Sequence, residues 1–110
     1  MIYVFDIDGT ICSNLCELDG GDYKKSEPYS SRIKKINKLF DEGNTIIYQT
    51  ARGMGRHENN PVFAIQEFYT LTASQLDRWG AKYHHLFLGK PAADYYIDDK
   101  GVEANDFFER

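Results

Sequence analysis

Apolar residues gather in short runs along the chain, and four of these runs are typical of strands. Residues 2–5 read IYVF, an unbroken set of β-branched and aromatic side chains that suits a strand buried on both faces of a parallel sheet. Residues 45–50 (TIIYQT) predict a second buried strand. Residues 82–90 (KYHHLFLGK) and 94–99 (DYYIDD) predict two more. The chain therefore has enough strand-forming segments for one central sheet.

A helical pattern separates the first two of these strands. Residues 30–44 read SSRIKKINKLFDEGN, and their apolar positions recur at helical spacing on one face. The members of that face are Ile33, Ile36, Leu39 and Phe40. Ser30 or Ser31 is the expected N-cap, and Gly43 is the expected stop.

A second, longer helix is expected to begin at Pro61, run to about Trp79 and end at Gly80. Its apolar stripe should face the core, or a second copy of the chain where it exceeds what one face can bury. The stripe consists of Phe63, Phe68, Tyr69, Leu76 and Trp79. Residues 101–110 predict a short terminal helix. Because strands and helices alternate, the sequence predicts a three-layer, Rossmann-like α/β fold with a mostly parallel sheet.

The connection between the last two predicted strands is unusually short. Residues 89–93 are too few for a helical crossover, which takes a dozen or more residues between parallel strands. Two interpretations remain: residues 83–88 do not form an ordinary parallel strand, or the last two strands are joined in an unusual way.

Residues 11–29 form a polar, turn-rich stretch with Gly20 and Gly21 at its centre. We expect a β-hairpin or a flexible loop that projects beside the end of the first strand. This stretch holds both cysteines, Cys12 and Cys16. We expect free thiols there, because a lone C-x3-C lacks the further ligands that a zinc site needs.

The size and charge of the chain exclude several classes of protein. At 110 residues and 12.7 kDa, residues 1–110 can form one domain, but not a catalytic domain with a separate cap domain. The 17 acidic and 13 basic residues give a net charge of −4, which counts against a broad basic face for nucleic acid but not against a local basic pocket. No run approaches the roughly 18 apolar residues of a membrane helix. We therefore expect no membrane contact and a cytoplasmic location.

Two aspartates follow the first predicted strand. Asp6 and Asp8 stand two positions apart on an extended chain, so their carboxylates leave the same side of the backbone. Two like charges in one small volume repel each other and raise one pKa, unless a cation or a reaction needs them there. The pair is therefore the first candidate for chemistry.

The strand ends bring further polar residues to the same place. In open α/β sheets, ligands bind beyond the carboxyl ends of the strands. This rule gathers residues 6–10, 50–53, 89–90 and 98–100. Together they supply two acidic pairs, a hydroxyl and a cation, which is the inventory for handling a phosphate with a divalent metal.

These motifs resemble those of the haloacid dehalogenase (HAD) superfamily of phosphohydrolases. DIDGT matches its first motif, IIYQT is similar to the second, Lys90 can serve as the third, and YYIDD is similar to the fourth. Their order and spacing agree over essentially the whole chain. The chain looks most like small capless members with T-A-R-G and G-K-P-x-A-D-x-x-I-D-D, some of which sit among enzymes of bacterial surface polysaccharide synthesis. T-A-R-G is also similar to the phosphatase half of polynucleotide kinase-phosphatases.

The resemblance implies a catalytic role for each matching residue. Asp6 would be the nucleophile that forms an aspartyl-phosphate, and Asp8 would protonate the leaving oxygen and then activate water. Thr50 would hydrogen-bond a phosphoryl oxygen, and Lys90 would offset charge on the nucleophile and on the transferring group.

The resemblance also implies contacts with the substrate. The expected substrate-binding residues are Gly9, Thr10, Ala51 and Arg52. Gly9 would let the chain turn tightly and bring backbone N–H groups to the phosphate. Arg52, and with it Arg56 and His57, would reach the leaving group or a second phosphate, although a solvated loop is the competing interpretation.

A Mg²⁺ ion belongs to the same pattern. The resemblance implies that Asp6, through its carboxylate, and Asp8, through its backbone carbonyl, hold the ion together with one or both of Asp98 and Asp99. We expect Asp99 as the direct ligand and Asp98 behind it or bound through water, because the second acid of such a pair takes the usual metal position in the family.

We therefore expect a Mg²⁺-dependent, capless phosphatase that hydrolyses a small phosphate monoester, such as a sugar phosphate or a precursor of surface polysaccharide. Its cleft should be open, with specificity from residues 11–29, residues 52–60 or a neighbouring subunit of a homo-oligomer. One alternative is a polynucleotide 3′-phosphatase, against which the acidic balance counts. The other is a non-catalytic HAD-like module that binds a phosphorylated ligand, although the presence of both Asp6 and Asp8 counts against it.

Overall fold

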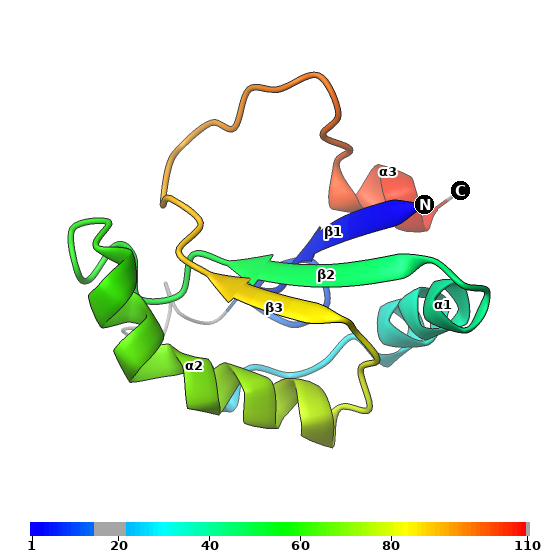
Figure 1. Cartoon of the computed structure of the whole chain (residues 1–110), viewed down its shortest axis with the longest axis horizontal. Helices are drawn as coiled ribbons and strands as arrows, with labels where there is room; N and C mark the ends of the chain where they lie inside the picture. The colour runs from blue at the N-terminus through cyan, green and yellow to red at the C-terminus, as the bar shows by residue number, and fades with distance from the viewer. Residues whose placement is uncertain (15–21, 110) are drawn as a thin grey trace.

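The structure is a computed structural model, and it describes residues 1–14 and 22–109. Within these residues, three parallel strands form one sheet in the order β1-β2-β3 (Figure 1). The strands are β1 (Ile2–Asp6), β2 (Thr45–Thr50) and β3 (His85–Leu88). In the middle strand, Tyr48 pairs with Phe5 of β1 on one side and Leu86 of β3 on the other. The predicted α/β class with a parallel sheet is confirmed.

Among the described residues, three α-helices bury the shared apolar face of the strands, and the first two also connect the strands. They are α1 (Ser30–Asp41), α2 (Pro61–Arg78) and α3 (Ala104–Phe108). α1 packs on β2, α2 packs on β3, and α3 lies beside β1, where Phe107 meets Phe5 edge to face (Figure 1). The core includes Ile7, Ile33, Ile36, Ile46, Tyr48, Phe68, Leu76, Leu86 and Leu88. None of the helices in the described part of the chain is long and apolar enough to cross a membrane.

The start of α1 differs from the prediction by one residue. Tyr29 holds the N-cap position and makes no side-chain capping bond, so the assignment of Ser30 or Ser31 to this position is wrong. The backbone N–H of Tyr29 donates to the carbonyl of Ile11 over 2.7 Å, which fixes the chain in a non-helical conformation at this residue. The other end follows the prediction, because Gly43 adopts a φ of +97° directly after the helix.

β1 is buried on one face only, which contradicts the prediction of burial on both. Phe5 is 7% exposed, whereas Ile2 is 71% exposed and Val4 is 52% exposed. β1 is an edge strand of this sheet, and the face that carries Ile2, Val4 and Phe87 stays open to solvent. A third layer over that face remains a prediction.

Residues 94–99 do not form the predicted fourth strand. The chain from residue 89 to residue 103 has neither strand nor helix, and it arches away from the end of β3 before it reaches α3 (Figure 1). Tyr95 and Ile97 are almost fully exposed on this arch. Residues 85–88 pair with β2 in an ordinary parallel register, so the interpretation that they form no such strand is wrong. The connection after them is too short for a helical crossover, which agrees with the lack of a further parallel strand among the described residues.

The two ends of the turn-rich stretch lie side by side. Cys12 forms an isolated antiparallel bridge with Pro28, and the N–H of Ser13 donates to the carbonyl of Glu27 over 2.9 Å. This pairing agrees with the hairpin interpretation for its two ends, whereas residues 15–21, with Cys16, lie outside the described residues. Cys12 itself is a buried free thiol, as predicted.

Candidate functional site

The carboxyl ends of the three strands open onto one hollow of about 360 Å³. Its walls include Asp6, Asp8, Thr50, Arg52, Lys90 and Tyr96. A hollow of this size can hold a small molecule. The structure thus brings together residues from the first three predicted motifs, because parallel strands end at the same edge of the sheet.

Asp6 ends β1, and Lys90 follows β3. Their side chains face each other across the end of β2, with 3.7 Å between the Lys90 Nζ and the Asp6 Oδ1. Burial raises the pKa of the Asp6 carboxyl, although the Lys90 ammonium and the backbone N–H of Ile7 act in the opposite direction. Asp6 is therefore a half-buried carboxylate with a single cation beside it among the described residues.

Lys90 is held at the site from two directions. Its backbone N–H donates to the carbonyl of Thr50 over 3.2 Å, which extends the pairing of β2 and β3 by one step. Its ammonium lies 4.3 Å from the centroid of the Tyr96 ring, close enough for a cation–π contact. Sequence reasoning did not assign Tyr96 to the site, because residues 94–99 predict a strand.

Asp8 has a different partner from Asp6. The Arg52 guanidinium donates from Nε to the Asp8 Oδ2 and from Nη2 to the Asp8 Oδ1, both over 2.9 Å. The Cys12 thiol lies against the same carboxylate, 3.5 Å from Oδ1, and burial together with the nearby negative charge raises its pKa to about 12. Cys12 therefore stays a neutral thiol and is not a nucleophile of this site.

The sequence predicted that Arg52 reaches toward the leaving group. In the structure it does not. It is 1% exposed, and its guanidinium is enclosed between Asp8 and two polar residues of α2, Thr72 and Gln75. The sequence contains a signal for the α2 side of this arrangement only. Thr72 and Gln75 are polar residues that lie within one turn of Leu76 and share its buried side of α2, where an unpaired polar group would be costly.

The turn after Asp8 is closed by its own hydrogen bonds. Gly9 has a φ of +80°, which agrees with the predicted tight turn. The N–H of Gly9 donates to the carbonyl of Cys12 over 2.9 Å, and that of Thr10 donates to the carbonyl of Ile7 over 3.0 Å. Both amides are therefore occupied, so the prediction that they reach a phosphate is wrong for this conformation.

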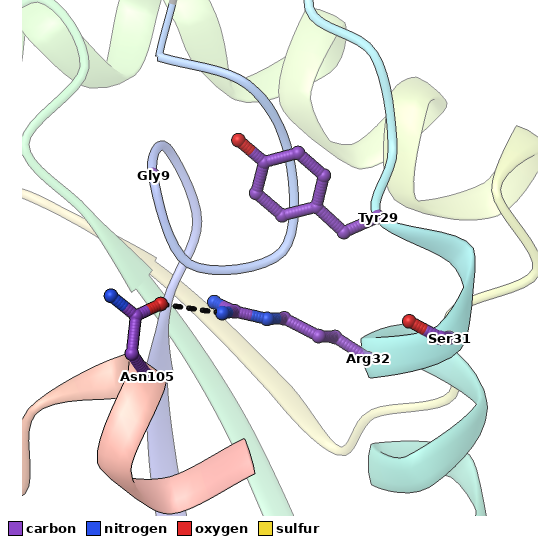
Figure 2. A pocket seen from close by; sticks show the side chains of 5 residues that line it. All are labelled: Gly9, Tyr29, Ser31, Arg32 and Asn105. Atoms are coloured by element: carbon purple, nitrogen blue, oxygen red, sulfur yellow. Dashed lines mark hydrogen bonds between the residues drawn. The ribbon is translucent and has the colours of Figure 1, made fainter. Parts of the chain in front are cut away.

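Arg32 of α1 supports this turn from behind. Figure 2 shows its side chain pointing from α1 toward the turn at Gly9, across a second hollow that Tyr29 and Ser31 also line. Its Nη1 donates to the carbonyl of Thr10 over 3.0 Å, and its Nη2 donates to the Asn105 Oδ1 over 2.6 Å. Arg32 thus connects α1, α3 and the turn after Asp8.

Thr50 ends β2 inside the hollow and is 1% exposed. Its Oγ1 accepts a hydrogen bond from the backbone N–H of Arg52 over 3.1 Å, which leaves the hydroxyl hydrogen available as a donor. Ala51 lines the hollow between them. The chain then turns sharply at Gly53, which has a φ of +79°.

Replacing Gly53 with alanine is expected to destabilise the fold by about 3 kcal/mol. A Cβ atom here would lie 2.6 Å from the Phe68 ring and would force a side chain into the left-handed backbone region. Denaturant unfolding measures the change. Gly55→Ala is the matched control, because no atom lies within 4 Å of its Cβ position. Equal stability of the two variants would contradict the assignment of close packing to Gly53.

Asp98 and Asp99 do not join the other carboxylates. Both are exposed on the arch, and neither lines the hollow. The Asp98 Oδ1 accepts from the backbone N–H groups of Lys100 (2.8 Å) and Gly101 (2.6 Å), and these bonds lower the pKa of Asp98. Residues 1–14 and 22–109 contain no cluster of three or more acidic, histidine or cysteine side chains that could hold a metal ion.

The donors that do lie in the hollow suit a hard cation. Mg²⁺ is commonly bound by one or two carboxylates, with water and substrate phosphate completing its six oxygen ligands. Asp6 lines the hollow with such a carboxylate, and a cation beside it would offset the burial that raises its pKa. The residues present therefore fit the predicted ion at Asp6. In this conformation Asp98 and Asp99 lie outside the hollow and cannot join it.

Arg56 and His57 are engaged elsewhere. The Arg56 Nη1 and the His57 Nε2 each lie 2.7 Å from a carboxylate oxygen of Glu67 on α2. These contacts hold the loop after Thr50 against α2, and they lower the pKa of Glu67. In this conformation neither side chain makes the predicted contact with a leaving group.

Comparisons with known proteins bear on the fold. The sequence matches no protein-family model and no curated protein sequence. The structure is similar to the crystal structure of a structural-genomics target from Vibrio cholerae, with a TM-score of 0.86 and 25% sequence identity. The match covers 99% of this chain and 88% of that chain. The chain therefore shares its α/β fold, over almost its whole length, with a protein of known structure.

Proposed function

We propose that this chain is a HAD-type phosphatase without a cap domain, which hydrolyses a small phosphate monoester such as a sugar phosphate or a precursor of surface polysaccharide. The observation that carries the proposal is the position of Asp6, which faces Lys90 across 3.7 Å in a hollow that Thr50 also lines. A carboxylate, a cation and a hydroxyl donor are the groups needed to attack a phosphorus atom and to hold its oxygens.

In the first step, a carboxylate oxygen of Asp6 attacks phosphorus, and the bond from phosphorus to the leaving oxygen breaks. Asp8 gives the leaving oxygen its proton, so that the alcohol departs neutral. Lys90 and Thr50 bind oxygens of the transferring group, where negative charge must be held. The product of this step is an aspartyl-phosphate at Asp6.

In the second step, Asp8 takes a proton from a water molecule, and the water oxygen attacks the same phosphorus atom. The bond between phosphorus and the Asp6 oxygen breaks, which releases inorganic phosphate and restores the free carboxylate. Asp8 again carries the proton with which the cycle began. Its place two residues after Asp6 puts it beside the nucleophile without giving it the same role.

Mg²⁺ is part of this proposal, with the Asp6 carboxylate and the Asp8 backbone carbonyl as its ligands. When bound, the ion would supply positive charge beside the nucleophile and the phosphate. The family's three-layer core and a homo-oligomer are also proposed. The open sheet face with Ile2, Val4 and Phe87 supports both, because an apolar surface of this kind is commonly covered by further structure or by a second subunit.

The experiment that tests the proposed function is phosphate release from a panel of phosphomonoesters with Mg²⁺. The panel contains sugar phosphates, glycerol phosphates, nucleotides, 3′-phosphorylated oligonucleotides and a chromogenic aryl phosphate. Turnover of sugar phosphates supports the proposal, whereas preference for the oligonucleotide, weakening with salt, would favour the polynucleotide 3′-phosphatase. If folded protein with Mg²⁺ turns over no member, the non-catalytic phospholigand-binding module becomes the leading hypothesis.

Replacing Lys90 with alanine is expected to lower kcat by about 10²–10³-fold, because the cation faces both Asp6 and the phosphoryl oxygens. Lys90→Arg should retain part of the rate, since it keeps the charge. Steady-state kinetics on the best substrate of the panel measures both. Lys100→Ala, on the exposed arch, serves as the control for loss of a lysine. An unchanged kcat in Lys90→Ala would remove Lys90 from the mechanism.

A further inference from the structure

We propose that Arg52 is a positioning residue, which acts on the reaction through Asp8 and without touching the substrate. The inference rests on the proposed function for the role of Asp8. Arg52 comes from the loop after β2, and Asp8 comes from the turn after β1, so the pair joins two motifs that are 44 residues apart. Its contacts on both sides of the guanidinium carry the argument.

On one side, Arg52 fixes the plane of the Asp8 carboxylate. Two parallel bonds of 2.9 Å join Nε to Oδ2 and Nη2 to Oδ1. A bidentate pair of this kind restricts both the position and the rotation of the carboxylate, whereas a single ammonium restricts only a distance. The Asp8 Oδ2 keeps a further lone pair that can take a proton, whereas Oδ1 also accepts from the Cys12 thiol over 3.5 Å.

On the other side, α2 fixes Arg52. The remaining terminal nitrogen, Nη1, donates to the Gln75 Oε1 over 2.5 Å and to the Thr72 Oγ1 over 3.2 Å. The Tyr23 ring covers the guanidinium at 4.8 Å, and the Gln75 Nε2 donates to the Tyr23 carbonyl over 2.6 Å. The guanidinium is thus bonded in three directions, so its position is set by the core and not by solvent.

Burial separates this role from substrate binding. The Arg52 side chain is 0% exposed and that of Asp8 is 14% exposed, so Asp8 is the member of the pair that can meet a substrate. Burying a charged arginine is costly, and the cost is offset only because each nitrogen of the guanidinium has a hydrogen-bond partner. Because α2 holds Arg52 in place and Arg52 holds Asp8, the helix fixes the orientation of the catalytic carboxyl.

The test is Arg52→Lys, assayed on 4-nitrophenyl phosphate and on the best substrate of the panel. Lysine keeps the charge but loses the two parallel bonds, so we expect kcat to fall about 10²-fold while KM changes less than about threefold. Thr72→Val is the matched control inside the same network, because it removes one bond to Nη1 and leaves both bonds to Asp8. Its kcat should fall far less than that of Arg52→Lys.

Other outcomes overturn the proposal. A rise in KM with unchanged kcat would make Arg52 a substrate-binding residue, and an unchanged kcat with lower stability would make its role structural only. Where Arg52→Ala folds, added guanidinium ion at millimolar concentration should restore part of its kcat, and ammonium ion should not.

A readout without turnover keeps this inference distinct from the proposed function. In wild-type protein, the Nε–H of Arg52 should give a slowly exchanging ¹⁵N NMR signal that is lost in Asp8→Asn. If the signal behaves in this way but no ester is hydrolysed, the proposed function fails while the bidentate pair of Arg52 and Asp8 is still supported. If wild-type protein shows no protected signal, the proposal that Arg52 positions Asp8 is refuted.

Discussion

Replacing Asp6 with asparagine is expected to lower phosphate release by at least about 10⁴-fold and to leave the fold intact. An amide oxygen cannot form the aspartyl-phosphate, so the first step has no nucleophile. The side chain is the same size and is 35% exposed, and it loses only the 3.7 Å contact with Lys90, so little stability depends on it. Steady-state kinetics, with unfolding curves for both proteins, measures the two effects.

The covalent intermediate gives this prediction a second readout. Rapid acid quench of wild-type protein during turnover should yield a protein heavier by one phosphoryl group, and peptide mapping should place the group on Asp6. Asp41→Asn is the control, because it makes the same chemical change in an exposed ion pair with Lys82 at the end of α1. Residual activity of Asp6→Asn within tenfold of wild type would exclude Asp6 as the nucleophile.

The local sequence pattern predicted most of the fold because it depends on short-range physics. β-branched runs form the strands, and helical spacing of apolar residues places Ile33, Ile36 and Leu76 in the core. Parallel strands end at one edge of a sheet, which is why Asp6 and Lys90 could be placed together from sequence alone. The rule was correct for the residues that end or follow β1, β2 and β3, and wrong for Asp98 and Asp99, because residues 94–99 form no strand.

Three features could not be read from local patterns. The exposure of Ile2 depends on what lies across the sheet, and the arch at residues 94–99 depends on the length of the preceding connection. The burial of Arg52 depends on Asp8, Thr72 and Gln75, which lie far from it in sequence. In each case a long-range contact, or its absence, outweighed a local preference.

The site shows the same division between local and long-range information. The carboxylates of Asp6 and Asp8 leave the backbone close together, as the sequence predicts, but the structure gives them different environments. Asp6 faces a lysine at 3.7 Å, and Asp8 is held by an arginine through two bonds of 2.9 Å. Two identical residues can take different roles in one reaction because their partners differ.

Removing divalent cations with a chelator is expected to lower turnover by at least about 10³-fold without unfolding the protein. A phosphate monoester brings further negative charge next to Asp6, where burial already disfavours the ionised carboxyl and Lys90 is the nearby cation. One ammonium cannot balance this charge, so a Mg²⁺ ion should be required. Phosphate release before and after chelation, and again after Mg²⁺ is restored, measures the effect. Turnover that persists in chelator would show a metal-independent reaction.

The acidic pair on the arch makes this prediction more specific. Asp98 already accepts two backbone hydrogen bonds, from Lys100 and Gly101, whereas the described residues offer Asp99 no hydrogen-bond partner. The Asp99 side chain can therefore rotate toward an ion without loss of a hydrogen bond. We expect Asp99→Asn to raise the Mg²⁺ concentration for half-maximal activity at least about tenfold, and Asp98→Asn to raise it less. Calorimetric titration of Mg²⁺ in the presence of inorganic phosphate should show the same order. Unchanged Mg²⁺ binding in Asp99→Asn would mean that the arch stays away from the site during the reaction, and that Asp6 and Asp8 hold the ion with water and phosphate alone.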